Sequence, residues 1–348
     1  MSATPRRGFL FGTGALGATA LLTGCLANDP PQQQNPSAVA AGGDNAAPGT
    51  QVTIGFSAPA ADHGWMAAMT TNARAQAEGL PDVTFRATEG SSDVNQQIAQ
   101  VETLINEQVD VLVILPADGK ALTDVARRAT RAGIPVVNVD RVFDSPDAYR
   151  VWIGGDNHGM GVNAADHIAA ELRRRGVADP VIAEIAGTDS LPLTQERSAG
   201  FRDGLARHGL RVARRVAADF TAESGERQAT NLLQAAAHLD AVWNHDDDQG
   251  IGVLAAVEAA GREEFFLVGG AGSRDMMERI KAGGGVVQAT VLYNPSMCSS
   301  AIALARLLVQ ARGMSDLAEH EVPRSITTYS AVVTRENVDR YLDVGFAS

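Results

Sequence analysis

The sequence predicts an α/β fold made of two doubly wound parallel-sheet lobes. The first observation is length, because single cores stop growing near about 250 to 300 residues and this chain has 348. The second is that short apolar runs alternate with longer segments of helical periodicity from Gln51 onward. This alternation is typical of parallel strands covered by helices on both faces. The apolar runs are too many for one small sheet, so we expect two similar lobes.

The apolar runs are the expected strands, in chain order. They are VTIGFS (52–57), VTFRAT (83–88), DVLVILP (110–116), IPVVNVD (134–140), YRVWIGG (149–155), PVIAEIAG (180–187), LRVARRVAADF (210–220), LDAVWNHD (239–246) and EFFLVGG (264–270). Helical periodicity marks the stretch that begins at Asp93 and residues 120–132, 157–175, 194–207, 248–260, 273–282 and 296–312. We place the crossing from the first lobe to the second near Gly154 to Asn157 and the return near Asn294.

The first 24 residues have the character of an export signal. A twin-arginine pair, Arg6 and Arg7, precedes an apolar run that contains no acidic residue. The run ends at Leu22-Thr23-Gly24-Cys25, which resembles the lipobox of bacterial lipoproteins, where the cysteine is acylated. We therefore expect a twin-arginine lipoprotein signal peptide and a lipid on Cys25. A retained transmembrane anchor is the alternative, but the apolar stretch is shorter than the roughly 20 residues that a span requires.

The segment after Cys25 is predicted to be a flexible tether. Residues 26 to 50 are rich in Pro, Gln, Gly, Asn and Ala and contain no aromatic residue, so they cannot bury a core. The expected organisation is a signal peptide over 1–24, a lipidated cysteine and tether over 25–50, a first lobe over 51–155 plus 294–323, and a second lobe over 156–293 plus 324–348.

Composition and motifs exclude several classes of function. The net charge is −12 and no basic stripe is present, so we expect no nucleic-acid partner. Two cysteines, Cys25 and Cys298, exclude a disulfide scaffold and a cysteine-rich zinc module, and we expect Cys298 to be buried and inert. His63 has no partner at metal-ligand spacing. The usual hydrolase, P-loop and zinc-protease motifs are absent, so we expect no metal, no cofactor and no catalytic residue.

Polar and aromatic side chains follow the expected strands where each strand ends. In open parallel sheets, ligands lie beyond the carboxyl ends of the strands. The loops there contain Ser57 with 61–66, 116–118, Asp140-Arg141, 156–157, Phe220, 244–248 and 269–273. Carboxylates accept hydrogen bonds from hydroxyls, arginine donates in a planar fork, and aromatic rings cover apolar C–H faces. The sequence therefore indicates a site for a polyhydroxylated ligand.

From about residue 51 to 348 the chain resembles the ribose-binding-like periplasmic solute-binding proteins of ABC sugar importers. The motifs that carry the resemblance are VTIGFS followed by GWM, VLVILPAD, IPVVNVDR, GGDNHGMG, IAGTDS with QERSAGF, LDAVWNHDD, FLVGG and YNP. The resemblance implies a type I periplasmic binding protein fold, whose two lobes are joined by a multi-strand hinge and close on a sugar. It also implies an ABC permease and ATPase as partners, an extracytoplasmic location and a monomer.

The resemblance further assigns ligand-binding positions. They are Ser57, His63, Trp65, Met66, Asp140, Arg141, Arg197, Phe220, Asp246 and Tyr293. Trp65 matches an aromatic residue that stacks on the sugar, and Asp140 with Arg141 matches a pair that grips ring hydroxyls. Leu115 stands where asparagine is usual and Ala271 where aspartate is usual. Together with the bulk of Trp65 and Tyr293, these departures favour a sugar or sugar alcohol that is different from ribose or larger.

Plainer interpretations stand beside these assignments. Asp140 and Arg141 could form a local ion pair, Trp65 could pack between the lobes, and Met66 could belong to the core. For Asp247 and Asp248 we favour a role at a helix N-terminus, where acidic side chains complement the helix dipole.

Alternatives also remain for the whole protein. One is a sensing module whose closed form docks on a chemoreceptor or sensor kinase, and another is an α/β enzyme. A related transcriptional repressor is excluded, because the tether occupies the place of its DNA-binding helices.

Overall fold

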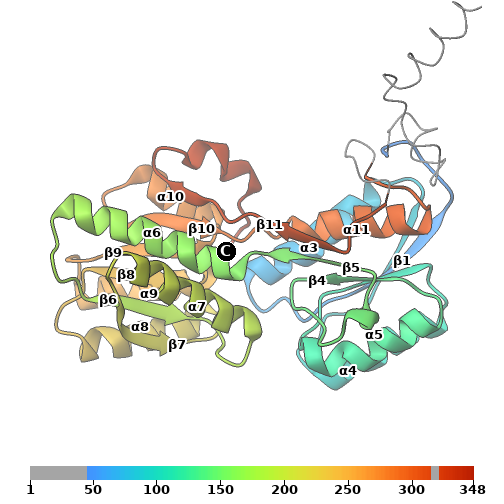
Figure 1. The fold of residues 1–348 in the computed structure, drawn as a ribbon, viewed down its shortest axis with the longest axis horizontal. Coiled ribbons are helices and arrows are strands. Elements are labelled where there is room, and N and C mark those ends of the chain that lie inside the picture. Colours follow the sequence, from blue (N-terminus) through green and yellow to red (C-terminus); the bar gives the residue numbers. More distant parts are fainter. Residues whose placement is uncertain (1–44, 315–320) are drawn as a thin grey trace, which may run out of the picture.

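The computed structural model describes residues 45–314 and 321–348, and these form two lobes side by side (Figure 1). The expected signal peptide, Cys25 and most of the tether lie outside the described residues. Each lobe contains a six-stranded, mainly parallel sheet with helices packed around it, so the predicted two-lobe α/β fold is confirmed. Among the described helices, none is long and apolar enough to cross a membrane.

The first lobe is built on an all-parallel sheet with the strand order β11-β5-β4-β3-β1-β2. Its strands are β1 (Val52–Ser57), β2 (Val83–Ala87), β3 (Val111–Ile114), β4 (Val136–Val139), β5 (Val151–Gly155) and β11 (Ser325–Thr328). Its helices are α3 (Gly64–Glu78), α4 (Val94–Asn106), α5 (Gly119–Arg131), the 3-10 turn η1 (Pro146–Ala148) and α11 (Met297–Val309). Strands such as β3 are buried at every residue because helices cover both faces.

The second lobe has the strand order β12-β10-β9-β8-β6-β7, in which only β12 is antiparallel to its neighbour. Its strands are β6 (Ile182–Ala186), β7 (Val212–Ala217), β8 (Ala241–Asn244), β9 (Phe266–Ala271), β10 (Val287–Leu292) and β12 (Val332–Thr334). Its helices are α6 (Asn157–Arg175), α7 (Pro192–Arg207), α8 (Ala222–Ala235), α9 (Asp247–Ala260), α10 (Arg274–Ala282), and the 3-10 turns η2 (Val338–Arg340) and η3 (Leu342–Val344).

The chain passes between the lobes three times, after β5, after β10 and after β11. The first crossing lies between Gly155 and Asn157, and the second lies between Leu292 and Met297. The third differs from the expected boundary at 323–324, because β11 pairs in parallel with β5 and belongs to the first sheet. Its residues Ser325 to Thr328 are exposed or half-buried, so no apolar run marks them as a strand.

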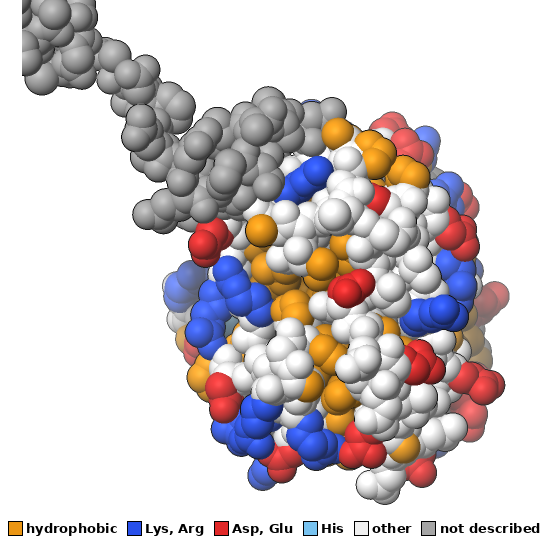
Figure 2. Space-filling model, turned by 90° about the vertical axis from the view of Figure 1, so that its right-hand side faces the viewer, with side chains coloured by type: hydrophobic (Ala, Val, Ile, Leu, Met, Phe, Trp, Pro, Cys, Tyr) orange, Lys and Arg blue, Asp and Glu red, His pale blue; other side chains and the backbone are white. Residues whose placement is uncertain are grey.

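Charge is mixed on the face of the molecule that Figure 2 shows. Lys and Arg side chains are interspersed there with Asp and Glu, and no continuous basic stripe crosses this face. The net charge of the whole chain is −12.

A buried ion pair joins α11 to the start of β2 in the first lobe. Arg306 Nε lies 2.8 and 2.9 Å from the two carboxylate oxygens of Asp82, and Nη2 lies 2.7 Å from Oδ2. Burial alone would raise the pKa of Asp82, but hydrogen bonds from Arg306, Gln310 and the Gly49 N–H outweigh it and hold that pKa well below its usual range. This ion pair therefore holds α11, which comes late in the sequence, against the first sheet.

The Asp82→Ala variant should lose about 3 kcal/mol of unfolding free energy at pH 7, because it leaves a buried guanidinium without its carboxylate. A lowered folded-state pKa stabilises the protein above the unfolded pKa of about 4, and this contribution is lost as the pH falls through the acid range. Urea unfolding should therefore show a smaller difference between variant and wild type at pH 3 than at pH 7. Asp110→Ala, which removes an exposed acceptor of the Thr53 N–H, is the control. A difference that does not change with pH would contradict the prediction.

Candidate functional site

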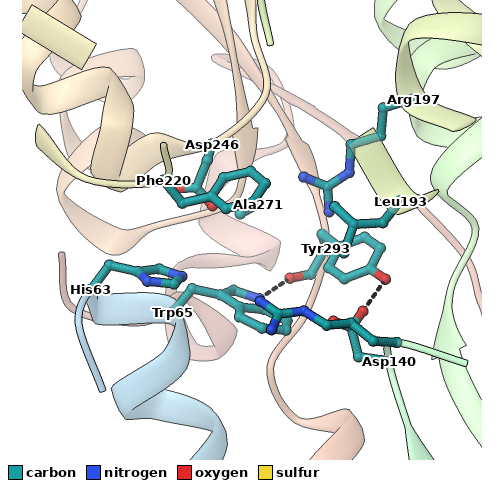
Figure 3. Close-up of a pocket in the computed structure, with 10 residues that line it drawn as sticks. His63, Trp65, Asp140, Leu193, Arg197, Phe220, Asp246, Ala271 and Tyr293 are labelled. Atoms are coloured by element: carbon teal, nitrogen blue, oxygen red, sulfur yellow. Dashed lines mark hydrogen bonds between the residues drawn. The ribbon is translucent and has the colours of Figure 1, made fainter. Parts of the chain in front are cut away.

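The cleft between the lobes holds a small cavity where the carboxyl ends of both sheets meet (Figure 3). The space between its walls is about 300 Å³, part of which is open to solvent. Its lining is His63, Trp65, Asp140, Arg141, Leu193, Arg197, Phe220, Asp246, Ala271 and Tyr293. Both lobes contribute, and Tyr293 lies on the crossing that follows β10. The strand-end rule therefore leads to one shared site between the two sheets.

Eight of the ten expected ligand-binding residues line this cavity, but Ser57 and Met66 do not. Ser57 ends β1 and is fully buried, and its hydroxyl accepts a hydrogen bond from Gln97 Nε2 at 3.2 Å. Met66 is 1% exposed and belongs to the core beneath α3. These surroundings agree with the plainer interpretation, in which Met66 belongs to the core.

Two positions that depart from the family pattern have different surroundings. Leu115 is fully buried and lies outside the lining. Leucine in place of asparagine at this position therefore removes no hydrogen-bonding group from this cavity. Ala271 does line the cavity and has a left-handed backbone, with φ of 75°. Leu193, at the start of α7, is an additional lining residue that the sequence did not indicate, since an apolar side chain after Pro192 resembles any helix start.

Asp140 is held in an unusual backbone conformation at the end of β4. Its φ is 60°, in the left-handed region that non-glycine residues seldom adopt, although aspartate tolerates it better than most. Its N–H donates to Ile153 O at 2.9 Å, and its carbonyl accepts from Trp152 Nε1 at 2.9 Å. The Tyr293 hydroxyl donates to Asp140 Oδ1 at 2.5 Å. These contacts hold the carboxylate in the cleft.

Arg141 does not form an ion pair with Asp140 in the part of the chain that the structure describes. Its Nη1 donates to Ala117 O at 2.9 Å, and its buried Nε has no hydrogen-bond partner among the described residues. The guanidinium is therefore fixed at one end and has a free donor at the other. This arrangement differs from the local ion pair that the sequence left open.

Aromatic rings form a continuous wall across the site. The Trp65 and Tyr293 ring centroids lie 5.8 Å apart, and Trp65 Nε1 donates to the Tyr293 carbonyl at 2.8 Å. The His63 ring stacks nearly parallel to Trp65 at 6.4 Å and also lies 6.1 Å from the Phe220 ring. Trp65 thus packs between the lobes and lines the cavity at the same time.

Arg197 enters the cavity from α7 and is almost fully buried. Nε donates to Asn157 Oδ1 at 2.9 Å, Nη1 donates to the His245 carbonyl at 3.2 Å, and the guanidinium carbon lies 4.5 Å from the Tyr293 ring centroid. At this distance a cation is attracted by the face of the ring.

A buried polar network that includes His245 supports Arg197. His245 Nε2 lies 3.0 Å from Glu184 Oε1, which also accepts the Ser198 hydroxyl. Burial lowers the pKa of His245. For Glu184, burial acts to raise the pKa, but the hydrogen bonds from His245 and Ser198 lower it overall. We assign a neutral imidazole and an ionised carboxylate to this pair, so Nε2 donates.

The three consecutive aspartates at the start of α9 have three different surroundings. Asp246 caps its own helix, accepting from the Asp248 N–H at 2.9 Å, and faces the cavity. Burial raises its pKa to about 7, and the nearby Asp248 carboxylate adds to the effect. Asp247 turns away and accepts from the N–H groups of Gly270, Gly272 and Ser273 at 2.8 to 3.0 Å.

The third aspartate, Asp248, reaches the other lobe. Its Oδ2 accepts from the Trp65 N–H at 2.9 Å. Asp247 and Asp248 lie in the first turn of α9, as we expected, and the contact of Asp248 with the other lobe is an addition that the sequence did not indicate. No short-range pattern indicates a contact between residues that lie 183 positions apart.

The described residues do not bring three or more His, Cys, Asp or Glu side chains together as metal ligands. Cys298 is fully buried near the start of α11, where burial raises the pKa of its thiol. The site therefore offers acceptors, donors and aromatic faces around a space between the lobes, which is suited to binding.

The family model described as "Periplasmic binding protein domain" matches residues 54–313. The chain belongs to this family. Among the curated relatives, the ribose import binding protein of Bacillus subtilis (strain 168) is 29% identical over 279 residues, covering 80% of this chain and 85% of the relative. The resemblance to ribose-binding-like periplasmic proteins is thus confirmed.

Solved structures of periplasmic binding proteins share the two-lobe fold. A solute binding protein of an ABC transporter from Mycobacterium smegmatis, solved with bound glycerol, aligns with a TM-score of 0.74 and 25% identity, covering 86% of this chain and 99% of that one. The arabinose-transporter protein from Shewanella sp. ANA-3, bound to L-arabinofuranose, aligns with a TM-score of 0.73 and 25% identity, covering 84% and 94%. These relatives are solute-binding proteins of transporters rather than enzymes.

Proposed function

We propose that this periplasmic binding protein captures a sugar or sugar alcohol between its lobes and presents the closed form to an ABC importer. The observation that carries the proposal is the cavity between the lobes, into which the two lobes direct Asp140, Arg141, Arg197 and Asp246 beside an aromatic wall. Carboxylates accept from ring hydroxyls, arginines donate to ring oxygens, and aromatic rings cover C–H faces. Binding and closure constitute the activity, and no bond is made or broken.

The size and charge of the cavity favour a small neutral ligand. The space between the lining residues is about 300 Å³ even when the part that is open to solvent is included, so it leaves room for a small ligand only. The rings of Trp65 and Tyr293 occupy part of the cleft, and the Tyr293 hydroxyl is already bonded to Asp140. These features support a single sugar ring or a polyol in preference to a larger saccharide. Ribose, arabinose and inositol are named with relatives of this chain, which supports the same class.

The proposal includes an extracytoplasmic location on a lipid anchor. The twin-arginine pair and the lipobox-like sequence ending at Cys25 support export and acylation. A tether of about 25 residues would span on the order of 25 to 30 Å and hold the lobes clear of a membrane. The permease and ATPase would be separate chains, and the binding protein would act as a monomer. Because the named relatives belong to importers, transport is favoured over the sensing alternative.

A thermal-shift screen tests the binding class directly. We expect D-ribose, L-arabinose, D-allose or myo-inositol to raise the Tm by several degrees, because a ligand at about 100 times its Kd adds roughly 2.7 kcal/mol. The Arg141→Ala and Asp140→Asn variants should lose most of this shift while keeping the ligand-free Tm, because asparagine tolerates the left-handed backbone at position 140 as aspartate does. Arg131→Ala, an exposed arginine at the end of α5, is the matched control. Full shifts in both site variants would remove the site assignment, and no shift with any of the four compounds would contradict the sugar class.

The unliganded protein should close more readily at low pH. Burial raises the pKa of Asp246 to about 7 in the closed form, whereas an exposed aspartate titrates near 4. Between these values the closed form binds more protons, so closure is favoured at low pH and the advantage is lost as the pH rises to about 7.

Small-angle X-ray scattering of the unliganded protein measures this effect. We expect a smaller radius of gyration at pH 5 than at pH 8, and a weaker difference in the Asp246→Asn variant. Asparagine keeps the helix cap and cannot ionise. A wild-type radius that is the same at both pH values would show that the buried carboxylate does not limit closure.

A further inference from the structure

The first turn of α3 is capped by the opposite lobe. The first N–H groups of a helix have no partner within the helix, and the residue before α3, His63, makes no side-chain cap. Instead, Asp248 of the second lobe accepts from the Trp65 N–H at 2.9 Å, and the nearby Gly64 N–H also acts to lower the pKa of this carboxyl. A carboxylate at this position also complements the positive end of the helix dipole.

Other helices of the first lobe are capped from within that lobe. Asp93 accepts from the Asn95 N–H at 2.8 Å at the start of α4, and Asp118 accepts from the Ala121 N–H at 2.7 Å at the start of α5. Asp93 lies two positions from the residue whose amide it caps, but Asp248 lies 183 positions from Trp65. The cap of α3 therefore depends on the relative position of the two lobes.

Gly64 fits closely against the second lobe at the same point. A Cβ on Gly64 would lie 2.2 Å from the Ala347 carbonyl oxygen and 2.7 Å from Asp248 Oδ1. Ala347 belongs to the second lobe, because its neighbour Phe346 accepts from the Arg274 N–H at 2.7 Å and bridges to Ser273. The obstacles to a larger residue at position 64 thus come from the opposite lobe and leave when the lobes separate.

We propose that Asp248 is a positioning residue that couples closure of the lobes to the order of the ligand-binding end of α3. Asp248 does not line the cavity, whereas His63 and Trp65, at the helix start that it caps, do. In the closed form the carboxylate completes the first turn and fixes the indole against Tyr293. When the lobes separate, the Gly64 and Trp65 N–H groups return to water. The inference rests on the proposed function, because it requires lobes that open and close around a ligand.

Calorimetry on the full chain with D-ribose, L-arabinose, D-allose and myo-inositol tests the coupling. Asp248→Ala should weaken the binding of whichever compound binds by about tenfold, the usual size of a lost helix cap, without lowering the ligand-free Tm. Asp248→Asn should recover part of the affinity, because asparagine caps helices as well as aspartate does. Gly64→Ala should also weaken binding, although alanine favours the helix itself.

Asp93→Ala is the matched control, because it removes a cap that lies within one lobe. It should lower the Tm equally with and without sugar and leave the Kd within about twofold. A purely structural role for Asp248 would reproduce this pattern, with a lowered ligand-free Tm and an unchanged Kd, and would overturn the proposal. Unchanged affinity in both Asp248→Ala and Gly64→Ala would also overturn it.

Amide hydrogen exchange separates this inference from the sugar proposal. If none of the four compounds binds the wild type, the sugar proposal fails, and exchange at Trp65 in the unliganded full chain, whose lobes close for part of the time, decides the question of the cap. Faster exchange of the Trp65 amide in Asp248→Ala than in wild type would support a cap between the lobes. Equal exchange in the two proteins would overturn it.

Discussion

The cleft is organised around carboxylates that lose water when the two lobes meet. A buried carboxylate is costly unless hydrogen bonds or positive groups replace its water. Each carboxylate accepts from a different hydrogen-bond donor in place of water. The donor is the Tyr293 hydroxyl for Asp140, the first N–H groups of α9 for Asp246, and the first N–H groups of α3 for Asp248. The remaining acceptor capacity of Asp140 and Asp246 faces the cavity, where ligand hydroxyls would supply donors.

Tyr293 connects these groups to the hinge. It follows β10 on the crossing back to the first lobe, and its carbonyl holds the Trp65 indole while its hydroxyl holds Asp140. Its ring lies under Arg197 and packs directly on Gly155, where a Cβ would come within 2.1 Å of the ring. Burial raises the pKa of this phenol well above its usual value, and the Asp140 charge adds to the effect, so the hydroxyl remains a donor. One side chain thus positions residues from both walls of the site.

The sequence predicted the strands and strand ends that follow from the burial of side chains within a short segment. Runs such as VLVILP are strands because both of their faces are covered, and the ends of those strands led to Asp140 and Asp246. Strands β10, β11 and β12 were missed. Gln and Thr interrupt the apolar pattern of β10, solvent reaches β11, and β12 has only three residues. Ser57 shows the limit of the strand-end rule, since successive side chains face opposite sides and one step turns a residue toward Gln97 and the core. The contact of Asp248 with Trp65 could not be foreseen, because it depends on how two separately folded lobes meet.

The balance of charge around the cavity has a consequence for selectivity. Asp140 and Asp246 line the cavity together with Arg141 and Arg197, and the Asp248 carboxylate lies outside the lining but close enough to raise the pKa of Asp246. Like charges confined in a dry space repel strongly, because the effective dielectric there is low. A sugar acid or sugar phosphate would add negative charge beside Asp246, whose pKa is already raised by burial and by Asp248. A neutral polyol instead donates hydroxyl hydrogens to these carboxylates, so the charges that oppose closure of the empty cleft also select an uncharged ligand.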